Sequence, residues 1–354
     1  MGLPTNYILT APLEVCLGIT NKCNLQCKHC LGSNTRRTPD LTTPELLGII
    51  QQLKELKVLN ISVFGGEPLT REDFFEILDA TDNLRVGVSL NTNGTLITRK
   101  VAKRLAGSRI KFYVVSLDGS CAEVHDALRG KGSFNAVIEG IRNLIAEECK
   151  VLVSTTVTRI NQNDLTNIAL LARRLGTYQL RLNTVECVGR AVCFQDGVIM
   201  DPAEKFKLAD QARLLKQTFG SFLTGSLVQV YDLMDEMAQQ PQAKFPLTIS
   251  TCGAGTIKCL IRPDGWVTPC EILWDVKAGN LREQSLFEIW HRSPVLNEFR
   301  RPFEIQEGEI PECNGCSYLR LCYKGHRCRP YYYPGAKFEH KELYCWRSDV
   351  ANAK

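Results

Sequence analysis

Two hydrophobic periods alternate along the first half of the chain. Between residues 13 and 186, short runs rich in β-branched and other apolar residues are separated by longer stretches in which apolar residues recur every three or four positions. The short runs predict strands, and the longer stretches predict amphipathic helices. We expect strands at 13–20, 58–64, 85–90, 110–117, 150–157 and 178–185, and helices at 44–57, 71–82, 98–106, 134–148 and 164–175.

The helix expected at 44–57 has the clearest start signal. Thr43 is expected to cap it, and Pro44 suits its first turn because an amide hydrogen there would have no partner within the helix. Its apolar stripe consists of Leu46, Ile49, Ile50, Leu53 and Leu56.

Six strand–helix alternations with nearly continuous apolar strands predict a parallel sheet covered by helices. The pattern alone leaves open whether this sheet is doubly wound or forms a partial barrel. After residue 200 the pattern becomes polar and helical, and from residue 251 cysteine, glycine and proline become frequent. We therefore expect an extension at 1–12, an α/β domain at 13–200, a helical bridge at 201–250 and an irregular, metal-stabilised domain at 251–354.

Composition and charge argue against several classes of protein. The chain has 354 residues and a formal net charge of +5, which is too small to predict a nucleic-acid-binding surface. No apolar run approaches the ~20 residues that cross a bilayer, and the amino terminus lacks the segments of a secretion signal. The sixteen cysteines are therefore expected to be mainly metal ligands in a reducing cytoplasm rather than disulfides of a secreted protein.

Three of the cysteines lie within eight residues. The stretch CNLQCKHC follows the first expected strand and places Cys23, Cys27 and Cys30 where parallel α/β folds carry their functional loops. Three thiolates can hold three irons of a [4Fe–4S] cluster and leave the fourth iron open to another ligand. A zinc site with a distant fourth ligand is the alternative on this spacing alone.

Small and polar residues follow the next three strands. GGEP (65–68), NTNG (91–94) and SLDG (116–119) stand at the ends of the second, third and fourth strands. Because the carboxyl ends of parallel strands meet at one edge of a sheet, these groups are expected on the same side as the three-cysteine loop. CxxxCxxC followed by GGEP resembles the signature of the radical S-adenosylmethionine (radical SAM) enzymes, and the resemblance extends over residues 13–190.

This resemblance implies a partial (β/α)6 barrel and a [4Fe–4S] cluster whose open iron binds SAM. In such enzymes an electron from the cluster splits SAM into methionine and a 5′-deoxyadenosyl radical, which abstracts a hydrogen atom from the substrate. The resemblance also implies where each cofactor contact lies. Gly65, Gly66 and Glu67 would lie at the methionine amino group, Ser116 and Arg129 at its carboxylate, Asn93 and Thr156 near the ribose, His29 beside the adenine, and Arg190 facing the cofactor.

Eight further cysteines lie in the tail, enough for two four-ligand sites of either zinc or iron–sulfur type. Their spacing, C-x12-G-x4-C from Cys252 to Cys270 and then C-x2-C-x5-C from Cys313, resembles the SPASM extension of radical SAM enzymes. One departure is the gap from Cys322 to Cys328, which is longer than is usual in that family. The resemblance implies two auxiliary [4Fe–4S] clusters, one on Cys252, Cys259, Cys270 and Cys328 and the other on Cys313, Cys316, Cys322 and Cys345.

Glu271 directly follows Cys270, at a position where some members of that family carry an acidic base. By this resemblance Glu271 would be catalytic and would take the proton released when a substrate radical is oxidised. The alternative is an exposed glutamate without a role in the reaction.

Several stretches, among them HCLGSNTRRTPDLTTPE and CGAGTIKCLIRPDGWV, look like the maturases of ribosomally made peptides. The group includes the mycofactocin maturase, the pyrroloquinoline quinone maturase and the tyramine-excising splicease. The resemblance implies a precursor-peptide substrate, hydrogen abstraction at Cβ of a tyrosine and carbon–carbon bond chemistry. Alternative substrates are a sulfatase active-site residue or a tetrapyrrole, and a non-catalytic iron–sulfur or zinc protein is the alternative from another class.

Many related maturases carry a winged-helix recognition domain before the barrel, whereas only residues 1–12 precede the first strand here. We therefore expect a separate small recognition protein to deliver the peptide. A flavodoxin- or ferredoxin-type donor is expected to supply electrons. No nucleic acid or membrane is expected as a partner.

Overall fold

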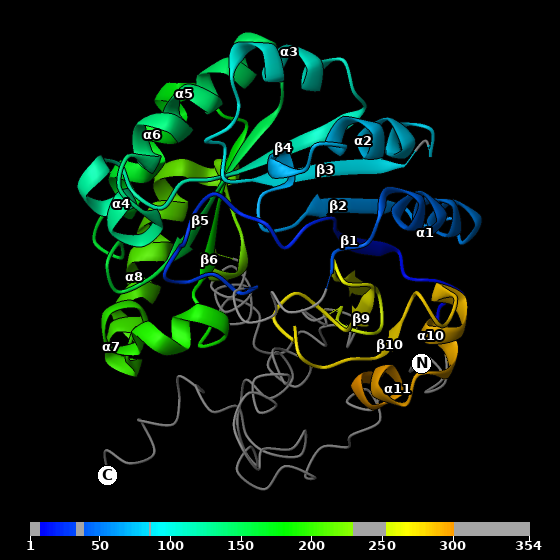
Figure 1. Cartoon of the computed structure of the whole chain (residues 1–354). Helices are drawn as coiled ribbons and strands as arrows, with labels where there is room; N and C mark the ends of the chain where they lie inside the picture. The colour runs from blue at the N-terminus through cyan, green and yellow to red at the C-terminus, as the bar shows by residue number, and fades with distance from the viewer. Residues whose placement is uncertain (1–7, 33–38, 85, 229–252, 301–354) are drawn as a thin grey trace, which may run out of the picture.

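The computed structural model describes residues 8–32, 39–84, 86–228 and 253–300 (Figure 1). Six parallel strands lie side by side in chain order, and helices cover the outer face of their sheet. The strands are β1 (Glu14–Gly18), β2 (Asn60–Phe64), β3 (Gly87–Thr92), β4 (Ile110–Ser116), β5 (Val151–Val157) and β6 (Gln179–Thr184). The helices between them are α1 (Thr43–Glu55), α2 (Phe74–Asp82), α3 (Arg99–Ala106), α4 (Ala122–Arg129), α5 (Ser133–Ala146) and α6 (Leu165–Leu175).

Alternate residues of each strand face the helices and form the main core. Fully burying an aliphatic side chain of this kind stabilises a fold by roughly 1.5–3 kcal/mol. The six parallel strands in chain order, with helices between them, confirm the partial (β/α)6 barrel that the resemblance implied. Strand residues of this core without exposed surface include Leu17, Leu90, Val115, Val153 and Leu180.

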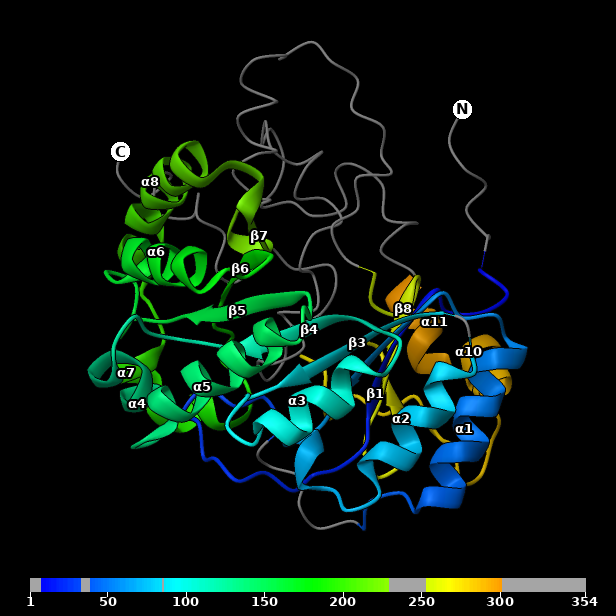
Figure 2. The same ribbon diagram turned by 90° about the horizontal axis from the view of Figure 1, so that it is seen from above.

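The sheet continues beyond the six strands on both sides. On one side β7 (Leu223–Thr224) pairs in parallel with β6. On the other side β8 (Lys258–Ile261) pairs in parallel with β1, and the antiparallel strands β9 (Trp266–Thr268) and β10 (Gly279–Asn280) follow. Figure 2 shows β8 next to β1. Residues that the sequence assigned to the tail thus extend the sheet of the barrel.

The remaining elements are short, apart from one helix after β6. That helix, α8 (Pro202–Phe219), lies in the region expected to be helical. None of the described helices is long and apolar enough to cross a membrane. The short elements are η1 (Pro68–Thr70), η2 (Gly189–Phe194), α7 (Gln195–Val198), η3 (Gly220–Phe222), α10 (Leu286–Arg292) and α11 (Pro294–Arg300).

The prediction that Thr43 caps the first helix is wrong. Thr42 is the cap, because its hydroxyl accepts a hydrogen bond from the Glu45 backbone N–H at 3.4 Å. In return, the Thr42 backbone N–H donates to the Glu45 carboxylate at 2.7 Å, which completes a capping box. The Thr43 hydroxyl instead donates to the side chain of Asp73 in the next loop.

Helix α4 has no counterpart among the expected helices. It is only eight residues long, and its buried face consists of His125, Leu128 and Arg129. Two of these three side chains are polar, so the segment carries little of the apolar periodicity by which helices are recognised in a sequence.

Two glycines inside helices should respond in opposite ways to alanine. A β-carbon at Gly140 in α5 would lie 2.1 Å from the Gly94 carbonyl oxygen, so Gly140→Ala is expected to lower the free energy of unfolding by about 2 kcal/mol. Gly48 in α1 has nothing within 4 Å of that position, so Gly48→Ala should raise it by roughly 0.5–1 kcal/mol. Urea denaturation measures both, and equal effects would contradict the close contact between α5 and the β3 turn.

Candidate active site

The three-cysteine loop, residues 23–30, follows β1 and is fastened by polar contacts that do not involve its thiols. Before the loop, the Thr20 hydroxyl donates to the Asp40 carboxylate at 2.7 Å. Arg190 donates from its side chain to the Cys27 carbonyl oxygen at 2.8 Å and from its backbone to the Cys30 carbonyl oxygen at 2.9 Å. Arg190, which was expected to face the cofactor, therefore holds the loop.

Two of the three sulfurs have N–H donors within reach. The Leu25 backbone amide lies 3.4 Å and the Asn93 side-chain amide 3.9 Å from Cys23 Sγ. The Arg129 guanidinium lies 3.8 Å from Cys27 Sγ. Burial raises the pKa of both thiols, whereas these donors lower it. Such donors stabilise the thiolate, which is the form of cysteine that binds iron.

Cys23, Cys27 and Cys30 are free cysteines. In the part of the chain that the structure describes, no three Cys, His, Asp or Glu side chains are grouped so that they could hold a single metal ion. Thiolates of an iron–sulfur cluster bind different irons, so they lie further apart than the ligands of one zinc ion. In such a cluster, Cys23, Cys27 and Cys30 would each bind a separate iron.

The GGEP turn packs directly on the chain that leads into the cysteine loop. A β-carbon at Gly65 would lie 2.6 Å from the Thr20 carbonyl oxygen, and one at Gly66 would lie 2.2 Å from the Lys22 carbonyl oxygen. The Gly66 amide donates to Thr20 at 2.7 Å, and the Glu67 amide donates to Lys22 at 2.8 Å. The two backbones are so close that only glycine fits at both positions.

Glu67 joins the ends of β2 and β3. Its buried carboxylate accepts hydrogen bonds from the Leu69 backbone at 3.2 Å, the Thr92 hydroxyl at 2.8 Å and the Asn93 backbone at 2.7 Å. Burial raises the pKa of Glu67 to about 7, although these hydrogen bonds lower it. The acid of GGEP thus fixes the turn that carries the two glycines.

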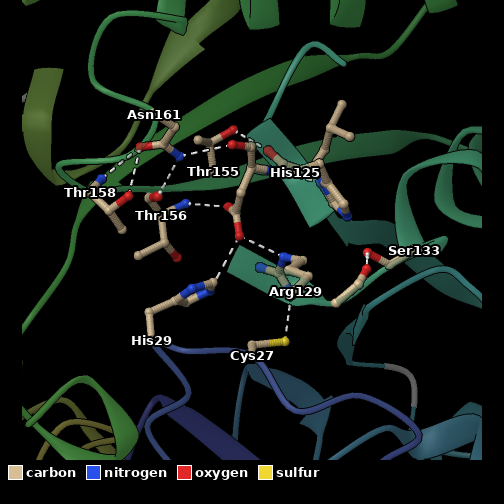
Figure 3. Close-up of polar contacts among 12 residues, drawn as sticks. Cys27, His29, His125, Arg129, Ser133, Thr155, Thr156, Thr158 and Asn161 are labelled. Atoms are coloured by element: carbon tan, nitrogen blue, oxygen red, sulfur yellow. Dashed lines mark hydrogen bonds and ion pairs between the residues drawn. The ribbon is translucent and has the colours of Figure 1, made fainter. Parts of the chain in front are cut away.

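Asp118, in SLDG, is a buried charge between the cysteine loop and β5. Its carboxylate accepts a hydrogen bond from Arg129 Nε at 2.6 Å and lies 3.2 Å from His29 Nε2. In Figure 3, His29 and Arg129 approach this carboxylate from two sides. Burial alone would raise the pKa of Asp118, but Arg129 and then His29 lower it. Burial also lowers the pKa of His29 to about 4, so its ring is neutral at pH 7.

The other side chains expected near SAM lie along the same edge. The Asn93 side chain donates to Asn24 of the cysteine loop at 2.9 Å. Ser116 is the last residue of β4. The Thr156 backbone N–H donates to Asp118 at 2.8 Å. Ser116 and Thr156 thus lie near the ends of neighbouring strands, and Asn93 contacts the loop. That these residues bind SAM stays a prediction.

Sequence reasoning quoted SLDG but assigned no role to its aspartate or to Asn161. The Asn161 side chain donates to the carbonyl oxygens of Asp118 at 3.0 Å and Thr156 at 2.9 Å, and it also accepts from the Thr158 backbone. His125 accepts a hydrogen bond from the Asp118 backbone. The acid of SLDG was visible in the sequence, but its partner Arg129 lies eleven positions later, so no local signal indicated the ion pair.

Two of the expected ligands in the tail are described, Cys259 and Cys270, and both are buried. Glu271 forms an ion pair with Lys258 of β8, whose Nζ lies 3.1 Å from both carboxylate oxygens. Burial would raise the pKa of Glu271, but Lys258 lowers it. The other six expected ligands lie outside the described residues: Cys252, Cys313, Cys316, Cys322, Cys328 and Cys345.

Comparison with known proteins agrees with this geometry. Residues 17–172 match the Radical SAM superfamily, and residues 252–317 match SPASM, an iron–sulfur cluster-binding domain. The chain is 34% identical over 322 residues to the mycofactocin maturase MftC of Mycobacterium tuberculosis, an alignment that covers 90% of this chain and 78% of that protein. The chain belongs to the radical SAM superfamily. As a radical SAM enzyme with a SPASM domain, it uses SAM and three [4Fe–4S] clusters, one that binds SAM and two auxiliary.

Two further likenesses extend over most of the chain. The AdoMet-dependent heme synthase of Methanosarcina barkeri is 31% identical over 353 residues, which cover 95% of this chain and 96% of that protein. The solved structure of Streptococcus suis SuiB bound to S-adenosylmethionine has a TM-score of 0.76 and 20% identity, over 96% of this chain and 78% of that chain. SuiB has also been solved bound to its precursor peptide SuiA. At this identity the likeness to SuiB shows a shared fold.

Removing the charge of Asp118 should destabilise the radical SAM domain. In Asp118→Asn, an amide N–H would face either Arg129 or the Thr156 amide, and the guanidinium would lose its buried counter-charge. We expect the free energy of unfolding to fall by roughly 3 kcal/mol in urea denaturation. Asp79→Asn is the control, because Asp79 pairs with Arg104 at an exposed site and should cost less than about 1 kcal/mol. Equal losses in the two variants would contradict the role of Asp118.

Proposed function

We propose that this radical SAM enzyme is a maturase that modifies a residue of a ribosomally made precursor peptide. The observation that carries the proposal is the 34% identity to a mycofactocin maturase over 90% of the chain. The shared fold with a protein solved in complex with a precursor peptide is consistent with it. By the same resemblance, the substrate residue is a tyrosine that loses a hydrogen atom at Cβ before a carbon–carbon bond is made or broken.

In this proposal Cys23, Cys27 and Cys30 hold the cluster that binds SAM. Bound SAM, reduced through that cluster, supplies the radical that takes a hydrogen atom from the substrate. The protein binds and orients SAM through groups placed around the loop. Gly65, Gly66 and Glu67 lie at the amino group, Ser116 and Arg129 at the carboxylate, Asn93 and Thr156 near the ribose, and His29 beside the adenine.

Arg190 has an indirect role in this proposal. Its two hydrogen bonds end on the Cys27 and Cys30 carbonyl oxygens, so it positions the loop rather than the cofactor. Gly189 before it has φ +59°, and a β-carbon there would lie 2.4 Å from the Cys30 carbonyl oxygen. The η2 segment after β6 therefore contacts the end of the cysteine loop, whereas GGEP contacts the chain that leads into it.

Glu271 is the proposed base for the substrate. It adjoins Cys270, a proposed ligand of the first auxiliary cluster, and its carboxylate would accept the proton that the substrate radical releases on oxidation. Lys258 keeps this carboxylate ionised, and therefore able to accept a proton, at neutral pH.

A second candidate function is the modification of a tetrapyrrole. The alignment with the heme synthase covers 96% of that protein, more than the 78% of the mycofactocin maturase that is covered. The identity is lower, 31% against 34%, which is why we place the peptide first.

The proposed partners are the precursor peptide, a separate small winged-helix recognition protein and a flavodoxin- or ferredoxin-type electron donor. Titration of labelled precursor into the chain, with and without the recognition protein, tests the second of these. Tight binding of the precursor to this chain alone would contradict the need for a separate recognition protein.

Three clusters require about twelve irons per chain. We expect anaerobically reconstituted protein to contain that amount and to form 5′-deoxyadenosine from SAM when given a reductant. The triple variant Cys23→Ala, Cys27→Ala, Cys30→Ala should lose about four irons and all formation of 5′-deoxyadenosine. Cys193→Ala, at an exposed cysteine outside the proposed ligand sets, should lose neither. Zinc in place of iron, or SAM left intact by the wild type, would overturn the assignment.

Replacing the proposed base should separate cofactor cleavage from product formation. Glu271→Gln is expected to cleave SAM but to reduce the yield of modified product by about a hundredfold, a usual contribution of a general base. Product and 5′-deoxyadenosine are quantified together by liquid chromatography and mass spectrometry. Glu283→Gln, at an exposed glutamate, is the control. Full product yield from Glu271→Gln would remove Glu271 from the mechanism.

A further inference from the structure

Four side chains form a row across the inner face of the sheet, which is the face turned away from the helices. Ser116 of β4 is in register with Ser154 of β5, Ser154 with Arg181 of β6, and Arg181 with Thr224 of β7. We call these four residues the inner row. Their neighbours Leu180 and Leu223 are fully buried in the core under the helices, so Arg181 and Thr224 lie on the opposite face.

The charged member of the inner row has no partner in the described part of the chain. Arg181 is half-buried, and burial lowers the pKa of its guanidinium because charge is costly away from water. No hydrogen bond or ion pair joins it to another described residue. The Thr224 Oγ1 atom beside it is buried and also lacks a hydrogen-bond partner among the described residues. A buried hydroxyl such as that of Thr224 normally has a hydrogen-bond partner. Thr224 and the guanidinium of Arg181 are therefore suited to bind an acceptor supplied by a ligand.

The surrounding charges restrict which acceptor fits. Glu271 and Glu14 lie close enough to raise the pKa of Arg181, so two carboxylates already act on this part of the inner face. Lys258 is paired with Glu271 and offsets part of its charge, but not that of Glu14. The repulsion from these glutamates is weaker for a singly charged carboxylate than for a doubly charged phosphate, and one carboxylate matches the planar fork of the guanidinium.

The inner row also indicates how far Arg181 lies from the proposed cofactor site. Ser116, a proposed contact of SAM, begins the row, and Arg181 lies two strands further on. Adjacent strands lie about 4.8 Å apart, so the two positions are separated by roughly 10 Å. A substrate anchored at Arg181 would therefore extend its neighbouring carbons toward the cofactor, with Glu271 on the same face.

We propose that Arg181, assisted by the hydroxyl groups of Thr224 and Ser154, binds a carboxylate of the substrate. The proposal rests on the proposed function for the nature of the substrate, a peptide. The carboxylate is then the carboxyl terminus of that peptide or an Asp or Glu side chain close to the reacting residue. Arg181 is thus a specificity-determining residue on the inner face.

Binding of matched peptides to the anaerobic holoenzyme with SAM tests this inference. The probes are fluorescent tyrosine-containing decapeptides in three forms: one with a free carboxyl terminus and no acidic side chain, one amidated and carrying one aspartate, and one amidated and free of acids. Dissociation constants are measured by anisotropy for the wild type, Arg181→Gln and Arg174→Gln. Arg174 is an exposed arginine of α6, so its variant removes the same charge away from the inner face.

We expect the wild type and Arg174→Gln to bind one of the carboxylate peptides about tenfold more tightly than the neutral peptide. Arg181→Gln should abolish this preference while retaining its iron content and its affinity for the neutral peptide. The form that loses affinity identifies whether the carboxylate is terminal or on a side chain. A preference that persists in Arg181→Gln, or a wild type without any preference, overturns the proposal.

A separate arm distinguishes failure of the carboxylate site from failure of the peptide assignment. The decapeptides have no leader segment, so they test the active site itself and not delivery by a recognition protein. If none of them binds to protein that cleaves SAM, even at millimolar concentration, the peptide substrate is wrong, and the same three proteins are titrated with haemin and with haemin dimethyl ester. A preference for haemin that is lost only in Arg181→Gln supports the carboxylate site with a tetrapyrrole as its occupant. Equal binding of haemin and its ester, or a preference that Arg181→Gln retains, overturns the site as well.

Discussion

The arrangement of the active edge depends on how closely neighbouring backbones approach the cysteine loop. Gly66, at the end of β2, and Gly189, after β6, leave room for the carbonyl oxygens of Lys22 and Cys30, and a β-carbon at either glycine would come within 2.5 Å of them. A side chain at either place would force these backbones apart and move the sulfurs with them. The spacing of the thiols is therefore fixed by contacts from two distant segments as well as by the interval between cysteines.

Electrostatics adds a second constraint around the same loop. Arg129 contacts both Asp118 and Cys27, so one guanidinium links a buried carboxylate to a cluster ligand. Asp118 uses the Nε donor, which leaves other N–H groups of the fork for a ligand. Because its hydrogen bond to Asp118 fixes the position of Arg129, a cofactor carboxylate would meet a guanidinium that is already held in place. Such preorganisation lowers the entropic cost of binding.

The sequence predicts most of the strands and the order of the loops, because these depend on local period and spacing. Cys23, Cys27 and Cys30 as ligands of the first cluster follow from the family resemblance and stay a prediction. It fails where the outcome depends on contacts between distant segments. The cap at Thr42, the pairing of β8 with β1 and the ion pair of Glu271 with Lys258 leave no mark in local hydrophobicity. Asp118 was visible in SLDG, but its role follows from an arginine eleven positions later that only the fold brings to it.

The inner face explains why this sheet differs from an ordinary parallel sheet. Strands buried on both faces are apolar throughout, whereas here β2, β3 and β6 alternate between buried apolar residues and residues that are only partly buried. Polar groups such as Ser89, Asn91 and Arg181 stand on the inner side, where apolar residues would pack against one another and exclude a ligand. Folding is thus supported mainly by the outer core under the helices. The proposed sites for the cofactor and the substrate both lie on the inner face, so the described residues that stabilise the fold and those proposed to select the substrate lie on opposite faces of the same strands.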